Sequence, residues 1–400
     1  MKRSTSKLAY VTPALLVWAR ESRGFDVETA AKKIGVTIER LGEWESGQNW
    51  PTFSQLQKLA LDVYKRPSAV FFRKTLPPEN PLSIEFRTLL SSRIEQISPE
   101  TRLAIRQAKH LQNLQREILE AKPAPFILGD FKLDINRPVQ ETALEFRSFL
   151  GLEIEEQKAW KDHSSAFKSL RVKLEESGIG VFQLGFPIEE ARGFAIFGDP
   201  SIIILNSHDS QSGRIFTLVH ETCHLLLKVS SMLTNFKGGV IRREYIHLEK
   251  FCNNFSGEFL LPEKHFLPLA QSFNLEKDAW TESQLTRLAS IFKTSKEVVL
   301  RRLVHHGLAT STFYGSKKKI WDEAFREKKE EEQRKNLESG KPIMVQPAHK
   351  RVVSEKGITY ISKVLGMLSE GSMSQLDAYR YLGLKAEQFP KMLENLPNRL

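Results

Sequence analysis

Residues 215–229 limit how this chain can fold more than any other stretch does. They are strongly apolar, yet they carry the sequence His220-Glu221-Thr-Cys-His224 near their middle. In a helix, residues four apart lie on one face, so the two imidazoles would point the same way. Burying two histidines and a glutamate together is costly unless a partner neutralises them. The segment therefore predicts a buried helix whose histidines and glutamate need a neutralising partner.

A divalent metal ion is the partner that this spacing favours. Two histidines at positions i and i+4 can bind one zinc ion. Glu221, beside the first of them, can then take a proton from the zinc-bound water and pass it to a leaving amine. Mn²⁺ and Fe²⁺ are the alternatives to zinc, since these ligand types accept several metals. The metal-free alternative is a pair of hydrogen-bonded core histidines.

A third metal ligand is expected on the next apolar helix, predicted over residues 244–261. There Glu249 can complete a site of two histidines and one glutamate. Asn253, one turn later, can accept the Nδ1–H of a ligand histidine and fix its tautomer. The alternative is that Glu249 is only a surface charge. The rival ligands are His247, Glu244 and Glu258. We expect the two cysteines, Cys223 and Cys252, to be small buried residues rather than ligands.

Residues 12–72 are predicted to form short helices separated by tight turns. Asp26 and Thr37 can cap the second and third helices, and Gly35 and Gly47 can end them. This spacing is typical of the helix-turn-helix unit, whose second helix enters the major groove of DNA. The candidate DNA contacts are Lys32, Lys33, Arg40, Gln48 and Asn49.

Acidic residues weaken that interpretation of the N-terminal helices. The predicted recognition helix, residues 37–46, holds three glutamates against one arginine, and phosphate repulsion makes such a helix a poor reader of DNA by itself. The alternative is a protein-binding or dimerising domain. A second pair of short helices over residues 281–307 has the same ambiguity, and we expect it to be a small packing subdomain.

Between the N-terminal helices and the apolar helix at 215–229, the spacing of apolar residues changes from a helical pattern to short continuous runs. Residues 179–184, 193–197 and 201–205 are short runs rich in β-branched and aromatic residues, and we expect three strands of a small sheet, the last two as a hairpin. Residues 92–121, 138–177 and 317–338 are expected to be helical, the last of them solvated. The predicted fold class is α+β and mostly helical, with helical modules at the C-terminal end.

Charge and cysteine content restrict the partners and the compartment. The chain has 59 basic and 48 acidic residues, a net charge of +11, and about half of the excess lies in the first 75 residues. This favours a polyanion such as nucleic acid at that end. Two cysteines in 400 residues exclude a disulfide framework. With no apolar membrane span or signal-peptide core in sight, we expect a cytoplasmic protein without membrane contacts.

Several segments together carry a family resemblance. They are Ala191–Gly198, Ile203–Asn206, Arg214–Leu227, Glu249–Ser256 and Phe259–Pro262. Residues 191–262 resemble the ImmA/IrrE family of zinc metallopeptidases on this basis. The resemblance implies a gluzincin-like fold in which His220, His224 and Glu249 bind zinc and Glu221 is the catalyst. Thr222 and Cys223 depart from the family, which usually has a hydrophobic residue and a glycine there.

The N-terminal region carries a separate resemblance. Trp44-Glu-Ser-Gly47, followed by Pro51, is similar to the turn after the recognition helix in phage-repressor (Xre-type) helix-turn-helix domains. The expected organisation is a helix-turn-helix domain over 1–75, a helical linker region over 76–160 and a zinc metallopeptidase domain over 161–270. A small helix-turn-helix-like subdomain over 271–315, a charged helix over 316–345 and a C-terminal helical module over 346–400 follow.

Such fusions resemble regulators of mobile elements, stress responses and toxin–antitoxin modules. The resemblance implies a zinc endopeptidase of narrow specificity that cuts a repressor, toxin or other regulatory partner, with residues 12–72 bringing it to DNA. The alternative is a non-proteolytic antitoxin or transcriptional repressor that only binds its partner and DNA. A homodimer is an open alternative to a monomer. The substrate itself cannot be named from the residues.

Overall fold

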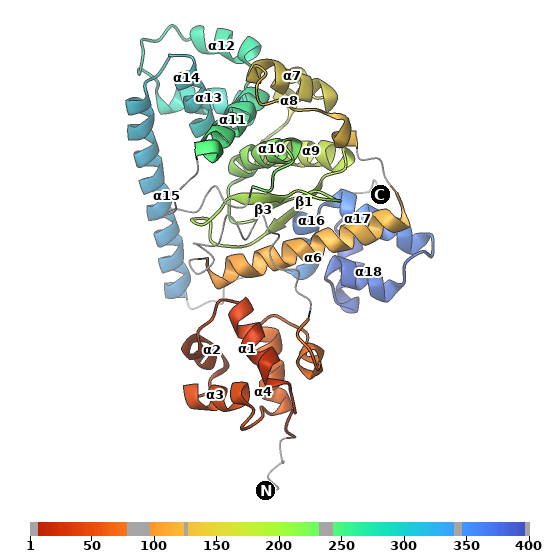
Figure 1. Cartoon of the computed structure of the whole chain (residues 1–400). Coiled ribbons are helices and arrows are strands. Elements are labelled where there is room, and N and C mark those ends of the chain that lie inside the picture. Colours follow the sequence, from red (N-terminus) through yellow and green to blue (C-terminus); the bar gives the residue numbers. More distant parts are fainter. Residues whose placement is uncertain (1–6, 78–96, 124–126, 232–242, 340–345, 397–400) are drawn as a thin grey trace. The chain divides into compact units, whose positions relative to one another are not determined.

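In the computed structural model, residues 7–77, 97–123, 127–231, 243–339 and 346–396 are described. They divide into two compact units, residues 1–107 and 108–400. The described part is mostly helical with one small sheet, as the sequence predicts (Figure 1). None of the described helices is long and apolar enough to cross a membrane.

The first unit is built from short capped helices. They are α1 (Pro13–Ser22), α2 (Val27–Ile34), α3 (Ile38–Ser46) and α4 (Phe53–Gln57), followed by a wider turn of helix over Lys58–Val63. Asp26 and Thr37 accept hydrogen bonds from the backbone of Thr29 and Arg40, as their predicted cap roles require. Gly35, at φ 82°, ends α2 in the left-handed region that favours glycine. Leu16, Leu41 and Trp44 are among the residues of its core.

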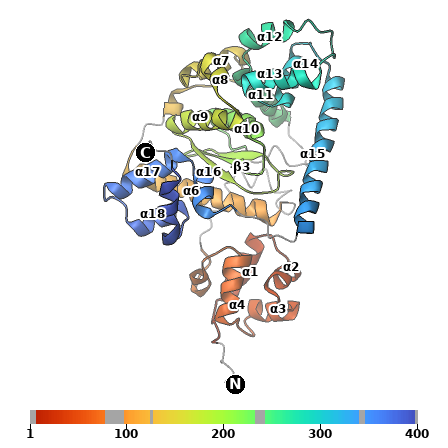
Figure 2. The same cartoon turned by 180° about the vertical axis from the view of Figure 1, so that it is seen from behind.

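The sheet of the second unit has three strands, β1 (Gly180–Leu184), β2 (Gly193–Ile196) and β3 (Ile202–Asn206). Their order is β1-β3-β2, with β1 parallel and β2 antiparallel to β3. The predicted hairpin of the last two strands is therefore confirmed, and β2 is an edge strand. Helices α9 (His163–Glu176) and α10 (Gln211–Leu226) cover one face, as Figures 1 and 2 show.

Close packing brings α10 down onto this sheet. A Cβ added at Gly193 would meet Thr217 Cγ2 at 2.6 Å and the Ile204 carbonyl oxygen at 2.8 Å. Only a glycine therefore fits where α10 crosses β2. On its other side α10 packs against α11 (Arg243–Leu260), and their apolar faces meet in one core with Phe255 and Phe259.

The described residues form further α-helices. They are α6 (Pro99–Ala121), α7 (Val139–Phe149), α8 (Ile154–Ala159), α12 (Glu263–Gln271), α13 (Glu282–Phe292), α14 (Lys296–His305), α15 (Ser311–Ser339), α16 (Ala348–Lys356), α17 (Ile358–Ser369), α18 (Gln375–Leu382) and α19 (Phe389–Glu394).

Residues 138–177, expected as one helical region, form three helices rather than one. Gly151 has a φ of 58° and breaks the first from the second. Asp162 accepts the backbone N–H of Ser165 and starts the third. Residues 92–96 of the expected long helix lie outside the described residues, and α6 begins at Pro99.

Candidate metal centre

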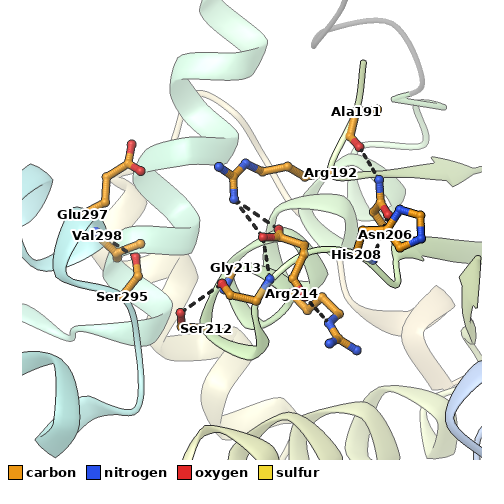
Figure 3. Close-up of polar contacts among 12 residues, drawn as sticks. Ala191, Arg192, Asn206, His208, Ser212, Gly213, Arg214, Ser295, Glu297 and Val298 are labelled. Atoms are coloured by element: carbon orange, nitrogen blue, oxygen red, sulfur yellow. Dashed lines mark hydrogen bonds and ion pairs between the residues drawn. The ribbon is translucent and has the colours of Figure 1, made fainter. Parts of the chain in front are cut away.

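Polar contacts at the start of α10 join it to the sheet. Asp209 is buried, and its Oδ1 accepts a hydrogen bond from Nη1 of the Arg192 guanidinium at 3.0 Å. Asn206, at the end of β3, donates from Nδ2 to the Ala191 carbonyl oxygen at 3.0 Å (Figure 3). Asp209, two residues before the helix that carries the histidines, is therefore tied to the residues just before β2, and those residues are tied to the end of β3.

His220, His224 and Glu249 come together between α10 and α11. Their ligand atoms lie within 4.8 Å of one another. The two Nε2 atoms are 3.1 Å apart, and Glu249 oxygens lie 3.3 Å from His220 Nε2 and 3.0 Å from His224 Nε2. Zinc bonds of about 2.0–2.2 Å at tetrahedral angles would separate ligand atoms by about 3.3–3.6 Å, a few tenths of an ångström more than most of these distances. The three side chains thus fit a single zinc ion.

The two histidines and the glutamate shift one another's pKa values. Burial alone would raise the pKa of Glu249, but hydrogen bonds with His220 and His224 lower it to about 2. Burial alone would lower the pKa of His224, but its contacts with Cys252 and Glu249 raise it well above 6.5. The carboxylate is therefore held ionised, as a metal ligand must be. A ligand histidine is neutral, so a metal ion bound here would replace the proton that His224 holds in its absence.

Glu221 is buried beside the first histidine, with 2% of its surface exposed. Its Oε2 accepts a hydrogen bond from Ser231 Oγ. Ser231 also bonds the edge strand, because its Oγ accepts the Ala195 N–H at 2.9 Å and its own N–H donates to the Ala195 carbonyl oxygen at 3.2 Å. Sequence reasoning missed this serine, which lies ten residues after Glu221 and outside the apolar helix.

Asn253 does not take the position that the sequence suggested. Its side chain is exposed, and among the described residues no group bonds Nδ1 of His220 or His224. A spacing of four residues puts Asn253 on the same side of α11 as Glu249, but one turn away along the axis and facing a cavity. The predicted bond from a ligand histidine to its amide oxygen is therefore wrong in this structure.

The rival ligands lie elsewhere or are paired. His247 is exposed. Glu258 accepts a hydrogen bond from the buried Arg302 and another from the Glu263 backbone. The side chain of Glu244 is outside the described residues. Of the acidic and histidine residues weighed on α11, only Glu249 is seen beside the two histidines in the part of the chain that is described.

The two cysteines are fully buried, Cys223 on α10 and Cys252 on α11. A hydrogen bond with Cys223 and burial raise the pKa of the Cys252 thiol far above its usual value, so it stays protonated at neutral pH. A metal ligand must be a thiolate. Thr222 is satisfied locally, because its Oγ1 donates to the Leu218 carbonyl oxygen at 2.7 Å.

The candidate DNA contacts lie in the first unit in two groups. Lys32 and Lys33 are exposed on the last turn of α2, and Gln48 is exposed after α3. Arg40 and Asn49 instead share one partner. Arg40 Nη1 lies 2.7 Å from a Glu43 carboxylate oxygen, and Asn49 Nδ2 donates to the same oxygen at 3.4 Å. Glu43, one of the three glutamates that weakened the DNA interpretation, thus bonds two of the candidate contacts.

Comparison with known proteins gives separate matches for the N-terminal helices and for the part of the chain that holds the candidate metal centre. Residues 174–304 match the family described as IrrE N-terminal-like domain, Peptidase_M78, and residues 16–61 match the helix-turn-helix family HTH_3. A comparison with curated proteins found no match. One similar solved structure is a Mycobacterium tuberculosis transcriptional regulator, at 14% identity and a TM-score of 0.28, covering 48% of this chain and 51% of that chain. The family matches show that the chain fuses an Xre-type helix-turn-helix domain to an IrrE-like Peptidase_M78 domain.

Proposed function

We propose that this chain is a zinc-dependent endopeptidase of narrow specificity that acts on a regulatory partner protein such as a repressor or toxin. The observation that carries the proposal is the spacing of 3.0 to 3.3 Å among the ligand atoms of His220, His224 and Glu249. The match of residues 174–304 to a peptidase family supports the same reaction class.

In this proposal His220, His224 and Glu249 hold the zinc, and Glu221 is the proton carrier. When bound, zinc would polarise a peptide carbonyl and lower the pKa of water enough to make hydroxide available at neutral pH. Glu221 accepts the proton of the attacking water and passes it to the amine that leaves. Ser231 orients the Glu221 carboxylate through its hydroxyl. Cleavage therefore needs the carboxylate itself, whereas zinc binding does not.

The helix-turn-helix domain supports a role in targeting. It belongs to a class of domains that bind DNA, and the exposed Lys32, Lys33 and Gln48 are the contacts that we propose. The domain would bring the peptidase to DNA or to a DNA-bound substrate. The domain limits that we expect from the sequence, with the peptidase over 161–270, remain part of this proposal.

A non-proteolytic antitoxin or repressor is the second candidate function. It is favoured by the state of Glu221, which is buried and already bonded by Ser231. In that case the partner protein would be neutralised by contact alone, and the metal would be structural.

Metal analysis and cleavage of the partner protein separate the two candidates. The partner to test is the protein encoded beside this one in the genome. We expect one zinc per chain in wild type and in Glu221→Gln, and a loss of cleavage of about 10²–10⁴-fold in the variant. Equal biological function of both proteins, with no cleavage by either, would favour the binding alternative.

A further inference from the structure

The C-terminal helices α17 and α18 (blue in Figures 1 and 2) are joined by the same kind of turn as α1 and α2. Gly24 follows α1 at φ 72°, and Gly371 follows α17 at φ 73°. Each glycine donates its N–H to the carbonyl oxygen three residues earlier, at 2.8 and 3.2 Å. The next residue donates to the carbonyl oxygen five residues earlier, at 3.2 and 3.0 Å. Asp26 and Ser374 then cap the following helix, because each accepts the backbone N–H three residues later.

The turn after the second helix of each set also matches. α2 and α18 both have eight residues, and each is followed by a glycine in the left-handed region, Gly35 at φ 82° and Gly383 at φ 69°. The next residue in each set donates its N–H to the carbonyl oxygen five residues earlier, at 3.1 and 3.0 Å. A third helix of nine residues begins three residues after the glycine. It is α3 in the N-terminal set, and in the C-terminal set it is residues 386–394, a 3-10 turn over Ala386–Gln388 that continues as α19.

The buried positions of the two sets coincide. Counted from the glycine of the second turn, the same four positions on the second and third helices are buried in both sets. In the C-terminal set the rings of Tyr379 and Phe389, 5.2 Å apart, join α18 to α19. Residues 358–396 thus repeat the local construction of the helices that match the helix-turn-helix family. The matched buried pairs are Ala30 and Ala378, Ile34 and Leu382, Leu41 and Phe389, and Trp44 and Met392.

The third helix of the C-terminal set has an open outer side. Six of the nine residues at 386–394 are exposed, while Phe389 and Met392 are buried on the side where α16 packs against α19. A similar turn joins α13 to α14, at Lys293 with φ 55°. There, however, only two of the ten residues of α14 are exposed. Within the part of the chain that is described, residues 386–394 therefore have a face for a partner that α14 lacks.

The charges on this face oppose DNA less than those on α3 do. α3 carries three glutamates and one arginine, and that arginine, Arg40, bonds Glu43. Residues 385–394 carry two lysines and two glutamates. Lys385 and Lys391 are exposed, and neither takes part in an ion pair among the described residues. Two cations without a carboxylate partner are therefore available to the phosphates of a duplex.

We infer that residues 358–396 are a second helix-turn-helix unit, and that residues 386–394 bind in the major groove of duplex DNA with Lys385 and Lys391 against the phosphates. In such units phosphate contacts fix the position, and outer residues of the helix meet the base edges. The inference goes beyond the proposed function, because this site lies outside both family matches and requires neither cleavage nor a metal ion.

DNA binding by the full chain tests the inference. The probe is a fluorescein-labelled pool of random-sequence duplexes of about 30 base pairs, long enough for a major-groove site, and anisotropy is measured at several salt concentrations. The background protein carries Lys32→Gln and Lys33→Gln, so that the contacts proposed for the N-terminal domain are absent. Adding Lys385→Gln and Lys391→Gln should weaken binding about tenfold or more at ~0.1 M salt and lower the salt slope by about two.

A matched control removes two other lysines from the same background. Lys264 on α12 and Lys277 after it are exposed, and α12 lies apart from α17 and α18 in Figures 1 and 2. Lys264→Gln with Lys277→Gln should leave the affinity and the salt slope unchanged, because exposed charges more than about 10 Å from the DNA are screened at ~0.1 M salt. Equal losses in the two double variants, or unchanged binding in both, would overturn the inference.

A change of opposite sign separates DNA contact from loss of folded structure. Glu387 is exposed on the same helix as Lys391. Glu387→Gln should strengthen DNA binding, because it removes a negative charge facing the phosphates, whereas damage to the fold can only weaken binding. If the lysine variants instead lose capture of the protein encoded by the neighbouring gene while DNA binding stays unchanged, the face docks a protein and the inference is wrong.

Discussion

The ion pair between Glu258 and Arg302 joins α11 to α14, and we expect its loss to lower the unfolding free energy strongly. Their side chains are only 1% and 6% exposed. Arg302→Met would leave a buried carboxylate whose remaining partner is the Glu263 N–H at 2.8 Å. Removing one partner of a buried pair costs about 3–5 kcal/mol of unfolding free energy. Replacing both by methionine should cost much less, because no charge then stays buried without a partner.

Urea unfolding followed by circular dichroism measures these changes. The control is the exposed pair Lys296–Glu282, whose side chains are 38% and 46% exposed and which joins α14 to α13. Lys296→Met should change the unfolding free energy by less than about 1 kcal/mol. A cost of Arg302→Met as small as this control, or a double variant as unstable as the single one, would refute the reasoning.

Three further outcomes are expected. His224→Ala should lose bound zinc, whereas Cys252→Ser should keep it, as measured by metal analysis of the purified proteins; zinc loss in the cysteine variant would contradict the ligand set. Burial lowers the pKa of Lys356 to about 8, so the unfolded chain binds more protons between about pH 8 and 10.5 and the unfolding free energy should rise with pH across that window. Urea midpoints at both ends of the window should show this rise, and Lys356→Met should reduce it, while Lys109 and Lys363, whose pKa values burial also lowers, keep part of it. Reversing the charge of Lys32 and Lys33 should weaken DNA binding and flatten its salt dependence by about one unit of slope per residue, measured by titration at several salt concentrations; no change would indicate a protein-docking domain.

Local signals in the sequence predicted much of the first unit. Asp26 and Thr37 cap their helices as expected, and Gly35 ends α2 because its backbone adopts a positive φ. Such features depend on neighbours within a few residues. The same signals could have divided the region predicted as helical over 138–177. The sequence has a glycine at 151, which adopts a positive φ, and an aspartate at 162, which caps the next helix.

The candidate metal centre was predictable only where helical spacing determines position. His220 and His224 share a face because they are four apart. Asn253 was placed by the same rule, but the rule gives a direction around the helix and not a contact with a neighbouring helix. Ser231 reaches Glu221 from a segment after α10. No periodic pattern contains that contact, because it depends on how the chain passes the edge strand.

That edge strand has a thermodynamic consequence for recognition. Ser231 bonds the N–H and the carbonyl oxygen of Ala195 in β2, and Ser230 bonds the N–H of Phe197 just after it. A ligand in extended conformation that pairs with β2 would exchange these bonds for its own and gain little net enthalpy from its main chain. Discrimination between sequences would then fall on side chains, so two peptides of equal length could differ widely in residence time.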